Sequence, residues 1–202
     1  MTINLSEIYT GLKAYRHERG LTAENQKAGY IVNVMEEMGE LAKALRCYER
    51  IKEHLSKDRD GMCGYHHHKY NLMLIDAEHE IIDAICDIAV YTINAGADIV
   101  KENYLTHFAD CNYFNFTDLV MICGDFANEY STDTYQHALL VWAMLCEKYG
   151  YNFEIAMIET IKEISSRTGK YDESAKKWVK DESDEAKSKW YKANFEKARI
   201  EK

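Results

Sequence analysis

Apolar residues recur every three or four positions along most of the chain, which is the periodicity of helices that bury one face. Strand-like alternation is essentially missing, and the absence of proline lets long helices run uninterrupted. The pattern predicts helices at about 5–19, 23–52, 72–100, 117–128, 134–148, 153–167 and 184–200. Gly20 follows the first of these as a C-cap. We therefore expect an all-α fold, a helical bundle.

Residues 54–71 interrupt this pattern with a polar, glycine-containing stretch, which we expect to be a loop or a frayed insertion. The stretch contains His66, His67 and His68, and histidine is a ligand of borderline metals such as zinc. Adjacent residues on a helix or strand do not converge on one ion, and no cysteine pair lies nearby. An exposed polar loop is therefore the favoured interpretation.

The chain of 202 residues is long enough for one domain with a substantial core. We expect a single all-α domain over residues 1–202, with core helices at about 5–100 and a helical extension at about 101–202. Residues 101–150 carry no functional assignment. No apolar run is long enough to span a membrane, and the N-terminus does not resemble a signal peptide. The six cysteines lack CxxC spacing, which is typical of reduced thiols in the cytoplasm.

The net charge of −9 argues against binding of nucleic-acid polymers, which requires a basic surface. The charge is unevenly distributed, because residues 162–202 carry a net +3 and the remainder carries −12. A basic tail thus follows an acidic body. Such a tail is either a solvated helical surface, the commoner case, or a cationic flap over an anionic substrate.

Two acidic clusters lie inside helical segments whose other residues are largely apolar. The first comprises Glu36, Glu37 and Glu40, and the second comprises Glu80 and Asp83. Carboxylates three or four positions apart on a helix repel one another and lower its stability. A chain keeps such an arrangement most readily when a cation neutralises it.

The first cluster alone is weak support for a site. Its helix has an apolar seam made of Ile31, Val34, Met38, Leu41 and Leu45. At about 100° per residue, the three glutamates project from the opposite side, flanked by Asn33 and Lys43. An acidic face opposite an apolar seam is the ordinary pattern of a solvated amphipathic helix.

The second cluster is stronger support for a site, because its helix is apolar around most of its circumference and is therefore expected to be buried. Its polar side chains fall on one narrow stripe, formed by Asp76, Glu80, Asp83, Asp87, Tyr91, Asn94 and Asp98. No lysine or arginine lies between residues 71 and 100 to pair with them. Ionised carboxylates in a buried helix are expensive unless they are paired or bound to metal. A cation-filled site between the two helices is thus favoured over a stripe that faces water.

Carboxylates of facing helices suit Mg²⁺, a hard cation that takes oxygen ligands and usually bridges to substrate phosphates. Mn²⁺ is a substitute. A carboxylate that is not fully used as a ligand can position or deprotonate an attacking water. No glycine-rich phosphate-binding loop is present, so metals and side chains must hold the phosphates. Metal-assisted hydrolysis of a phosphoanhydride is the predicted reaction class.

At these residues the chain resembles the all-α nucleoside triphosphate pyrophosphohydrolases, the MazG-like group with its dimeric dUTPase and phosphoribosyl-ATP pyrophosphohydrolase relatives. The family's EExxE…ExxD signature is similar to Glu36-Glu37-Met-Gly-Glu40 and Glu80-Ile-Ile-Asp83. The run from Asp83 through Asp87 to Tyr91 is similar to the D-A-x-x-D continuation of the MazG-like proteins. The gap between the two halves is longer than usual, which we attribute to an insertion at 54–71.

The resemblance implies Mg²⁺-dependent cleavage of a nucleoside triphosphate, ribo or deoxyribo, to the monophosphate and pyrophosphate. It also implies a helical fold that works as a homodimer or homotetramer. On this basis Glu37, Glu40, Glu80 and Asp83 become the principal metal ligands. Glu36 and Asp87 become additional ligands or the base that activates water.

A second similarity lies near the C-terminus, where basic residues of longer MazG-like proteins are expected near the phosphates. Carried over to this chain, it makes phosphate-binding candidates of Arg167, Lys170, Lys177 and Lys180. The asparagine expected before the basic position is Ile164 here. Further candidates for substrate binding lie on or beside the acidic faces, namely Asn33, Lys43, Tyr91 and Asn94. Asn33, Tyr91 and Asn94 are nearly as well explained as residues that orient a carboxylate.

Two alternatives from other classes remain open. A di-iron or di-manganese carboxylate protein would recruit Asp76 and His79 beside Glu80, although the usual paired Glu-x-x-His motifs are missing. A helical interaction module with degenerate acidic faces is the non-enzymatic alternative.

Overall fold

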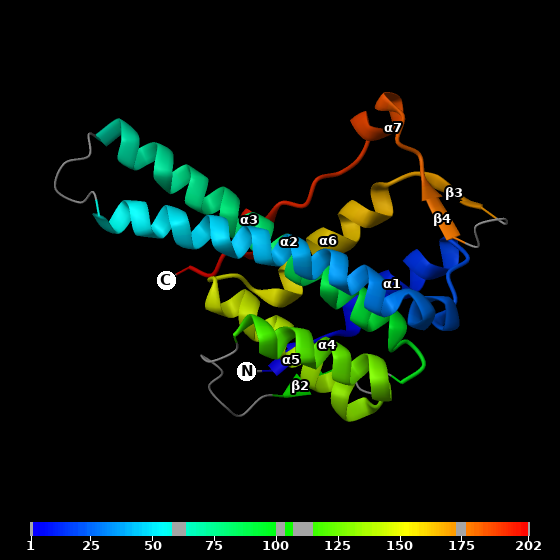
Figure 1. Ribbon diagram of the computed structural model, residues 1–202. Helices are drawn as coiled ribbons and strands as arrows, with labels where there is room; N and C mark the ends of the chain where they lie inside the picture. The colour runs from blue at the N-terminus through cyan, green and yellow to red at the C-terminus, as the bar shows by residue number, and fades with distance from the viewer. Residues whose placement is uncertain (1, 58–63, 100–103, 107–114, 173–176, 202) are drawn as a thin grey trace.

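The computed structural model describes residues 2–57, 64–99, 104–106, 115–172 and 177–201, and these are mostly helical, as expected (Figure 1). The helices are α1 (Ser6–Glu18), α2 (Ala23–Lys57), α3 (Gly64–Ala95), α4 (Phe116–Glu129), α5 (Thr132–Lys148), α6 (Phe153–Ser166), α7 (Asp184–Ser188) and the 3₁₀ turn η1 (Phe195–Ala198). The short strands are β1 (Thr2–Asn4), β2 (Tyr104–Thr106), β3 (Gly169–Asp172) and β4 (Lys177–Lys180).

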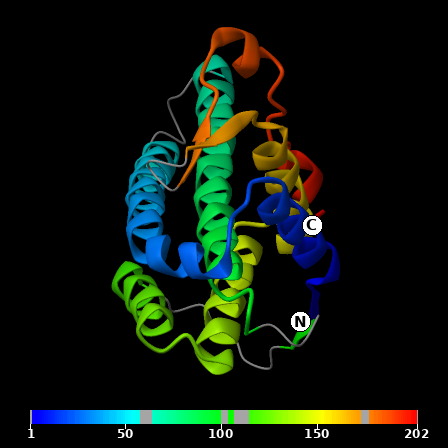
Figure 2. The same cartoon turned by 90° about the vertical axis from the view of Figure 1, so that its right-hand side faces the viewer.

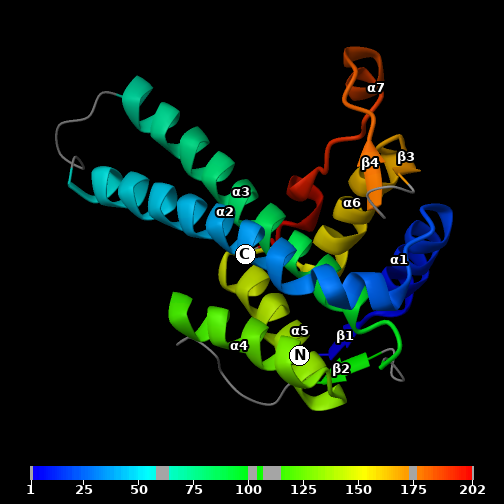
Figure 3. The same cartoon turned by 45° about the vertical axis from the view of Figure 1, so that its right-hand side comes forward.

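The long helices α2 and α3 pack along each other and form the centre of the molecule. Figure 2 shows α2 on one side of α3, with α1 and α6 on the other. Helices α4 and α5 form a further layer against α2 and α3. The C-terminal end of α2 and the N-terminal end of α3 project beyond the rest of the fold (Figure 3). None of the helices within the described ranges is sufficiently long and apolar to cross a membrane.

The core lies where α3 meets its neighbours. Most residues of α3 from Ile81 to Ala95 are buried, as its apolar circumference predicts. The seam of α2 is largely confirmed, since Val34, Met38 and Leu41 are buried, although Ile31 is 40% exposed. The largest fully buried side chain is that of Trp142 on α5.

Helix ends follow the local sequence. Gly20 has φ +64°, and the amide of Leu21 donates to the carbonyl of Arg16 at 2.9 Å, so the predicted C-cap of α1 is confirmed. Asn115 and Ser131 begin α4 and α5 with reciprocal capping boxes.

The expected loop at 54–71 is wrong at both ends, because α2 continues to Lys57 and α3 begins at Gly64. Between these ends, residues 58–63 lie outside the described part of the chain. The helices continue because they support each other here: Ile51 is buried, and His54 stacks on Tyr70 with ring centroids 5.9 Å apart. Tertiary packing thus outweighs the polar, weakly helical composition.

The expected helix at 184–200 is also largely wrong, since only α7 and η1 form there. The intervening backbone instead binds side chains of α6. The amide of Tyr191 donates to Ser166 Oγ at 2.8 Å, and the amide of Ala193 donates to Glu163 Oε2 at 2.7 Å. These long-range bonds replace the amide-to-carbonyl bonds of a helix.

The described part of the structure contains two small antiparallel sheets that the sequence pattern did not predict. The first joins segments that are distant in the chain, and the second joins segments that are close in the chain. β1 pairs with β2 through Ile3 and Leu105, and β3 pairs with β4 through Lys170 and Val179. The second sheet follows α6 and lies above α1 (Figure 1). Among the described residues, the cysteines at positions 47, 86, 123 and 146 are free thiols, whereas those at 63 and 111 lie outside the described ranges.

Candidate functional site

Carboxylates of α2 and α3 meet across the interface between these helices. Glu37 on α2 and Asp83 and Asp87 on α3 are half-buried, whereas Glu36 and Glu40 are exposed. Asp83 and Asp87 share one face of α3, because residues four apart are neighbours on a helix. We call Glu37, Asp83 and Asp87 the carboxylate cluster.

Each member of the carboxylate cluster holds its proton more tightly than an ordinary acid. Burial, followed by repulsion from Glu40 and Asp83, raises the pKa of Glu37 to about 7. Burial and the charge of Asp87 also raise the pKa of Asp83 to about 7. Burial and the charge of Glu37 do the same for Asp87, whose pKa is again about 7. The three shifts show that the two helices bring these acids within electrostatic reach of one another.

Two cations moderate this repulsion. Arg167 directly follows α6, and its Nη2 donates to Glu163 Oε1 at 2.6 Å. Its charge lowers the pKa of both Asp83 and Asp87, which act on it in return. Lys180 on β4 lowers the pKa of Asp87. The structure therefore brings two basic residues, one just after α6 and one on β4, to the carboxylate cluster.

A cavity of about 440 Å³ adjoins the cluster on the side of the C-terminal segment. Its lining is Asp76, His79, Glu80 and Asp83 of α3, Glu163 of α6, and Lys192, Ala193 and Phe195. Glu80 is exposed and opens on this cavity together with Asp83. Part of the polar stripe of α3, namely Asp76, Glu80 and Asp83, thus faces a hollow with water access, whereas most residues of α3 from Ile81 to Ala95 are buried.

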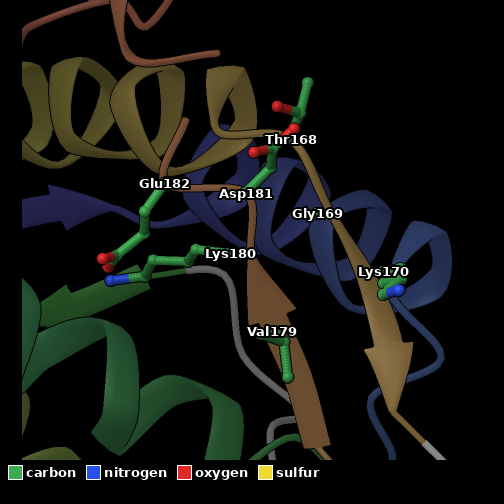
Figure 4. A pocket seen from close by; sticks show the side chains of 7 residues that line it. All are labelled: Thr168, Gly169, Lys170, Val179, Lys180, Asp181 and Glu182. Carbon is green, nitrogen blue, oxygen red and sulfur yellow. The ribbon is translucent and has the colours of Figure 1, made fainter. Parts of the chain in front are cut away.

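A second, open pocket of about 500 Å³ lies at the β3–β4 hairpin. Figure 4 shows the side chains of Lys180 and Glu182 extending toward the same side, with Lys170 on the other strand. Lys170 and Lys180 both line the pocket. The side chain of Lys177 lies outside the described part of the structure.

The remaining predicted substrate residues are dispersed. Asn33 is half-buried and Lys43 is exposed on α2. Tyr91 is half-buried beside the cluster. Burial, followed by the charges of Glu37 and Asp87, raises the pKa of its hydroxyl. Asn94 is buried instead in the core, where its Oδ1 accepts a 2.7 Å hydrogen bond from Arg16.

Glu163 is a site residue that the sequence reasoning missed. It lines the cavity, binds Arg167, and raises the pKa of Asp83 and Asp87. The signal was the spacing Glu159, Glu163, Arg167, which places three charged residues on one face of the helix expected at 153–167. Tyr15 of α1 was missed as well; its hydroxyl interacts electrostatically with Arg167 and Asp87.

The donor chemistry of the site fits a hard cation, since the cluster consists of oxygen ligands whose mutual repulsion a cation would relieve. As the side chains stand, no three His, Cys, Asp or Glu groups within the described ranges are arranged to ligate one ion together. Side-chain rotations are therefore needed for the cluster to bind a metal. No family model, curated protein or solved structure matches the chain.

Proposed function

We propose that the protein is a Mg²⁺-dependent pyrophosphohydrolase that cleaves a nucleoside triphosphate to the monophosphate and pyrophosphate. The observation that carries this proposal is the carboxylate cluster, in which Glu37, Asp83 and Asp87 each have a pKa raised to about 7 beside the cations Arg167 and Lys180. Perturbed acids gathered beside a cavity are typical of catalytic sites. The signature resemblance of the same residues supports the same reaction.

In the proposed site Glu37, Glu40, Glu80 and Asp83 would hold Mg²⁺, which supplies neutralisation of phosphate charge. Arg167 and Lys180 bind the phosphate oxygens that extend from the cluster. Asp87 accepts the proton of the water that attacks the α-phosphorus, a task that suits a carboxylate with a pKa near 7. The bond from the α-phosphorus to its bridging oxygen breaks, and pyrophosphate leaves.

We further propose that the protein acts in the reducing cytoplasm as a homodimer or homotetramer. The described free thiols are compatible with such a compartment.

The alternative carboxylate-bridged di-iron site would need His79 as a ligand. His79 Nε2 lies 3.0 Å from Glu196 Oε1, so this ring nitrogen already has a partner. That contact favours the pyrophosphohydrolase. Iron found by elemental analysis of the purified protein would reverse the preference.

The test is a pyrophosphate-release screen over ribo- and deoxyribonucleoside triphosphates with Mg²⁺. Asp83→Asn should lower turnover by about a thousandfold or more, because it removes a ligand and a charge at the reacting phosphate. The matched control is Asp125→Asn, which changes an exposed carboxylate on α4. Normal turnover in Asp83→Asn, or no turnover by the natural protein on any nucleotide, would overturn the proposal.

A further inference from the structure

Arg19 is a buried cation that caps the end of α6. Its side chain is only 5% exposed, and its Nη2 donates to the carbonyl oxygens of Ile164, Ser165 and Arg167 at 3.2, 3.2 and 2.9 Å. The last carbonyls of a helix lack intrahelical donors and carry partial negative charge. Arg19 supplies both the missing donors and the compensating charge, which offsets the cost of its own burial.

The same guanidinium is stacked between two other segments. It lies 4.3 Å from the ring centroid of Tyr15 on α1 and 5.1 Å from that of Trp178 on β4. Its carboxylate partner, Glu18, is 65% exposed and lies 3.4 Å away, so that ion pair contributes little. The contacts that matter therefore join α1, the end of α6, and the β3–β4 hairpin.

Both cations of the candidate site extend from the segments that Arg19 joins. The carbonyl oxygen of Arg167 accepts a hydrogen bond from Arg19, and the guanidinium of Arg167 donates one to Glu163. Lys180 lies two residues beyond Trp178 on the same strand. One buried side chain thus contacts both segments that carry these cations, at the carbonyl of Arg167 and at the ring of Trp178.

The two strands of the hairpin are paired along their length, with Gly169 opposite Lys180 and Lys170 opposite Val179. A Cβ atom on Gly169 would lie 2.3 Å from the carbonyl oxygen of Val179 and 2.8 Å from Trp178 Nε1. Only a glycine permits this close approach, so β3 packs directly against the backbone of β4 and the side chain of Trp178. Displacement of Trp178 would therefore displace Lys170 and Lys180 together.

We infer that Arg19 is a positioning residue that holds Arg167 and Lys180 beside the carboxylate cluster and so sets the affinity of the site for a triphosphate. The part that concerns the triphosphate rests on the proposed function. The anchoring of the hairpin does not, and it is tested separately.

Anchoring is measured by hydrogen exchange with mass spectrometry. Arg19→Met keeps the aliphatic stem and removes the donors; the control, Arg199→Met, removes another stacked arginine, 4.8 Å from the Tyr151 ring centroid. Amides of β3 and β4 should exchange about tenfold faster in Arg19→Met, relative to those of α4, and at the natural rate in Arg199→Met. Equal hairpin rates in both variants would overturn the inference. If Arg19→Met does not fold, Arg19→Lys provides the same comparison, with a smaller increase expected.

Positioning is measured by calorimetric binding of inorganic triphosphate with Mg²⁺ in a double-mutant cycle. Arg19→Met and Lys180→Met should each weaken binding about tenfold, and the double variant should be clearly less than a hundredfold weaker. Fully additive losses would contradict a positioning role. Failure of the natural protein to bind triphosphate would overturn the affinity part of the inference together with the proposed function. Non-additive binding losses without turnover of any nucleotide would overturn the pyrophosphohydrolase proposal alone.

Discussion

Neutralising Asp87 should stabilise the metal-free protein at alkaline pH. Asp87 is half-buried, and burial together with the charge of Glu37 raises its pKa from 3.8 to about 7. The folded state therefore holds a proton that the unfolded chain has released between about pH 4 and pH 7. Folding stability falls as pH rises through this interval, and the full loss is reached above pH 7.

The difference between 3.8 and about 7 corresponds to roughly 4 kcal/mol of unfolding free energy at pH 8. Two effects reduce what a single substitution recovers. The acids of the cluster titrate together, and Asp87→Asn also gives up the attraction of Arg167 and Lys180. We therefore expect Asp87→Asn to raise the free energy of unfolding by about 2 kcal/mol at pH 8 and by under about 0.5 kcal/mol at pH 4.

The assay is urea unfolding followed by circular dichroism, with EDTA present, at pH 4, 6 and 8. Asp125→Asn serves as the control, because Asp125 is exposed on α4 and its replacement should change stability by less than about 0.5 kcal/mol at every pH. No gain for Asp87→Asn at pH 8, or the same gain at all three pH values, would refute the reasoning that the cluster is electrostatically strained.

Two further predictions concern stability. Burial alone would raise the pKa of Glu159, but hydrogen bonds from Lys162, Tyr191 and Lys197 lower it to about 2. Urea unfolding should therefore show that Glu159→Gln lowers the free energy of unfolding by about 2–4 kcal/mol at pH 7, and this loss should shrink as pH falls from 4.5 toward 2. A loss that does not change with pH would contradict the electrostatic explanation. Gly169→Ala should destabilise the protein by about 1–3 kcal/mol, because the new methyl group would clash with the carbonyl oxygen of Val179 on β4. The control is Gly124→Ala, which should be neutral or slightly stabilising in the same assay because no atom lies within 4 Å of the new Cβ.

The helical periodicity of the sequence was sufficient to predict the main helices, because each has a continuous buried face. It failed where long-range contacts decide the backbone. The segment around Tyr191 looked helical, yet its amides bind Ser166 and Glu163 of α6. The β3–β4 strands span four residues each, which is too short for an alternating pattern to be distinctive.

The candidate site was predictable in part for the same reason. Asp83 and Asp87 stood out because acids are conspicuous on an apolar helix, and Glu37 stood out through the signature resemblance; the structure brings the three together. Glu163 was obscured by the ordinary amphipathic pattern of α6. Arg19 is simply the last residue of the helix expected at 5–19, and only the tertiary fold shows its three carbonyl partners.

The central claim is that the carboxylate cluster supports hydrolysis between the α- and β-phosphates of a nucleoside triphosphate. Phosphorus-31 nuclear magnetic resonance of a reaction mixture with Mg²⁺ follows this bond directly. The proposal predicts one pyrophosphate for each nucleoside monophosphate formed, with both products absent when Asp83→Asn replaces the natural protein. Orthophosphate with nucleoside diphosphate, or no product from any nucleoside triphosphate, would contradict it.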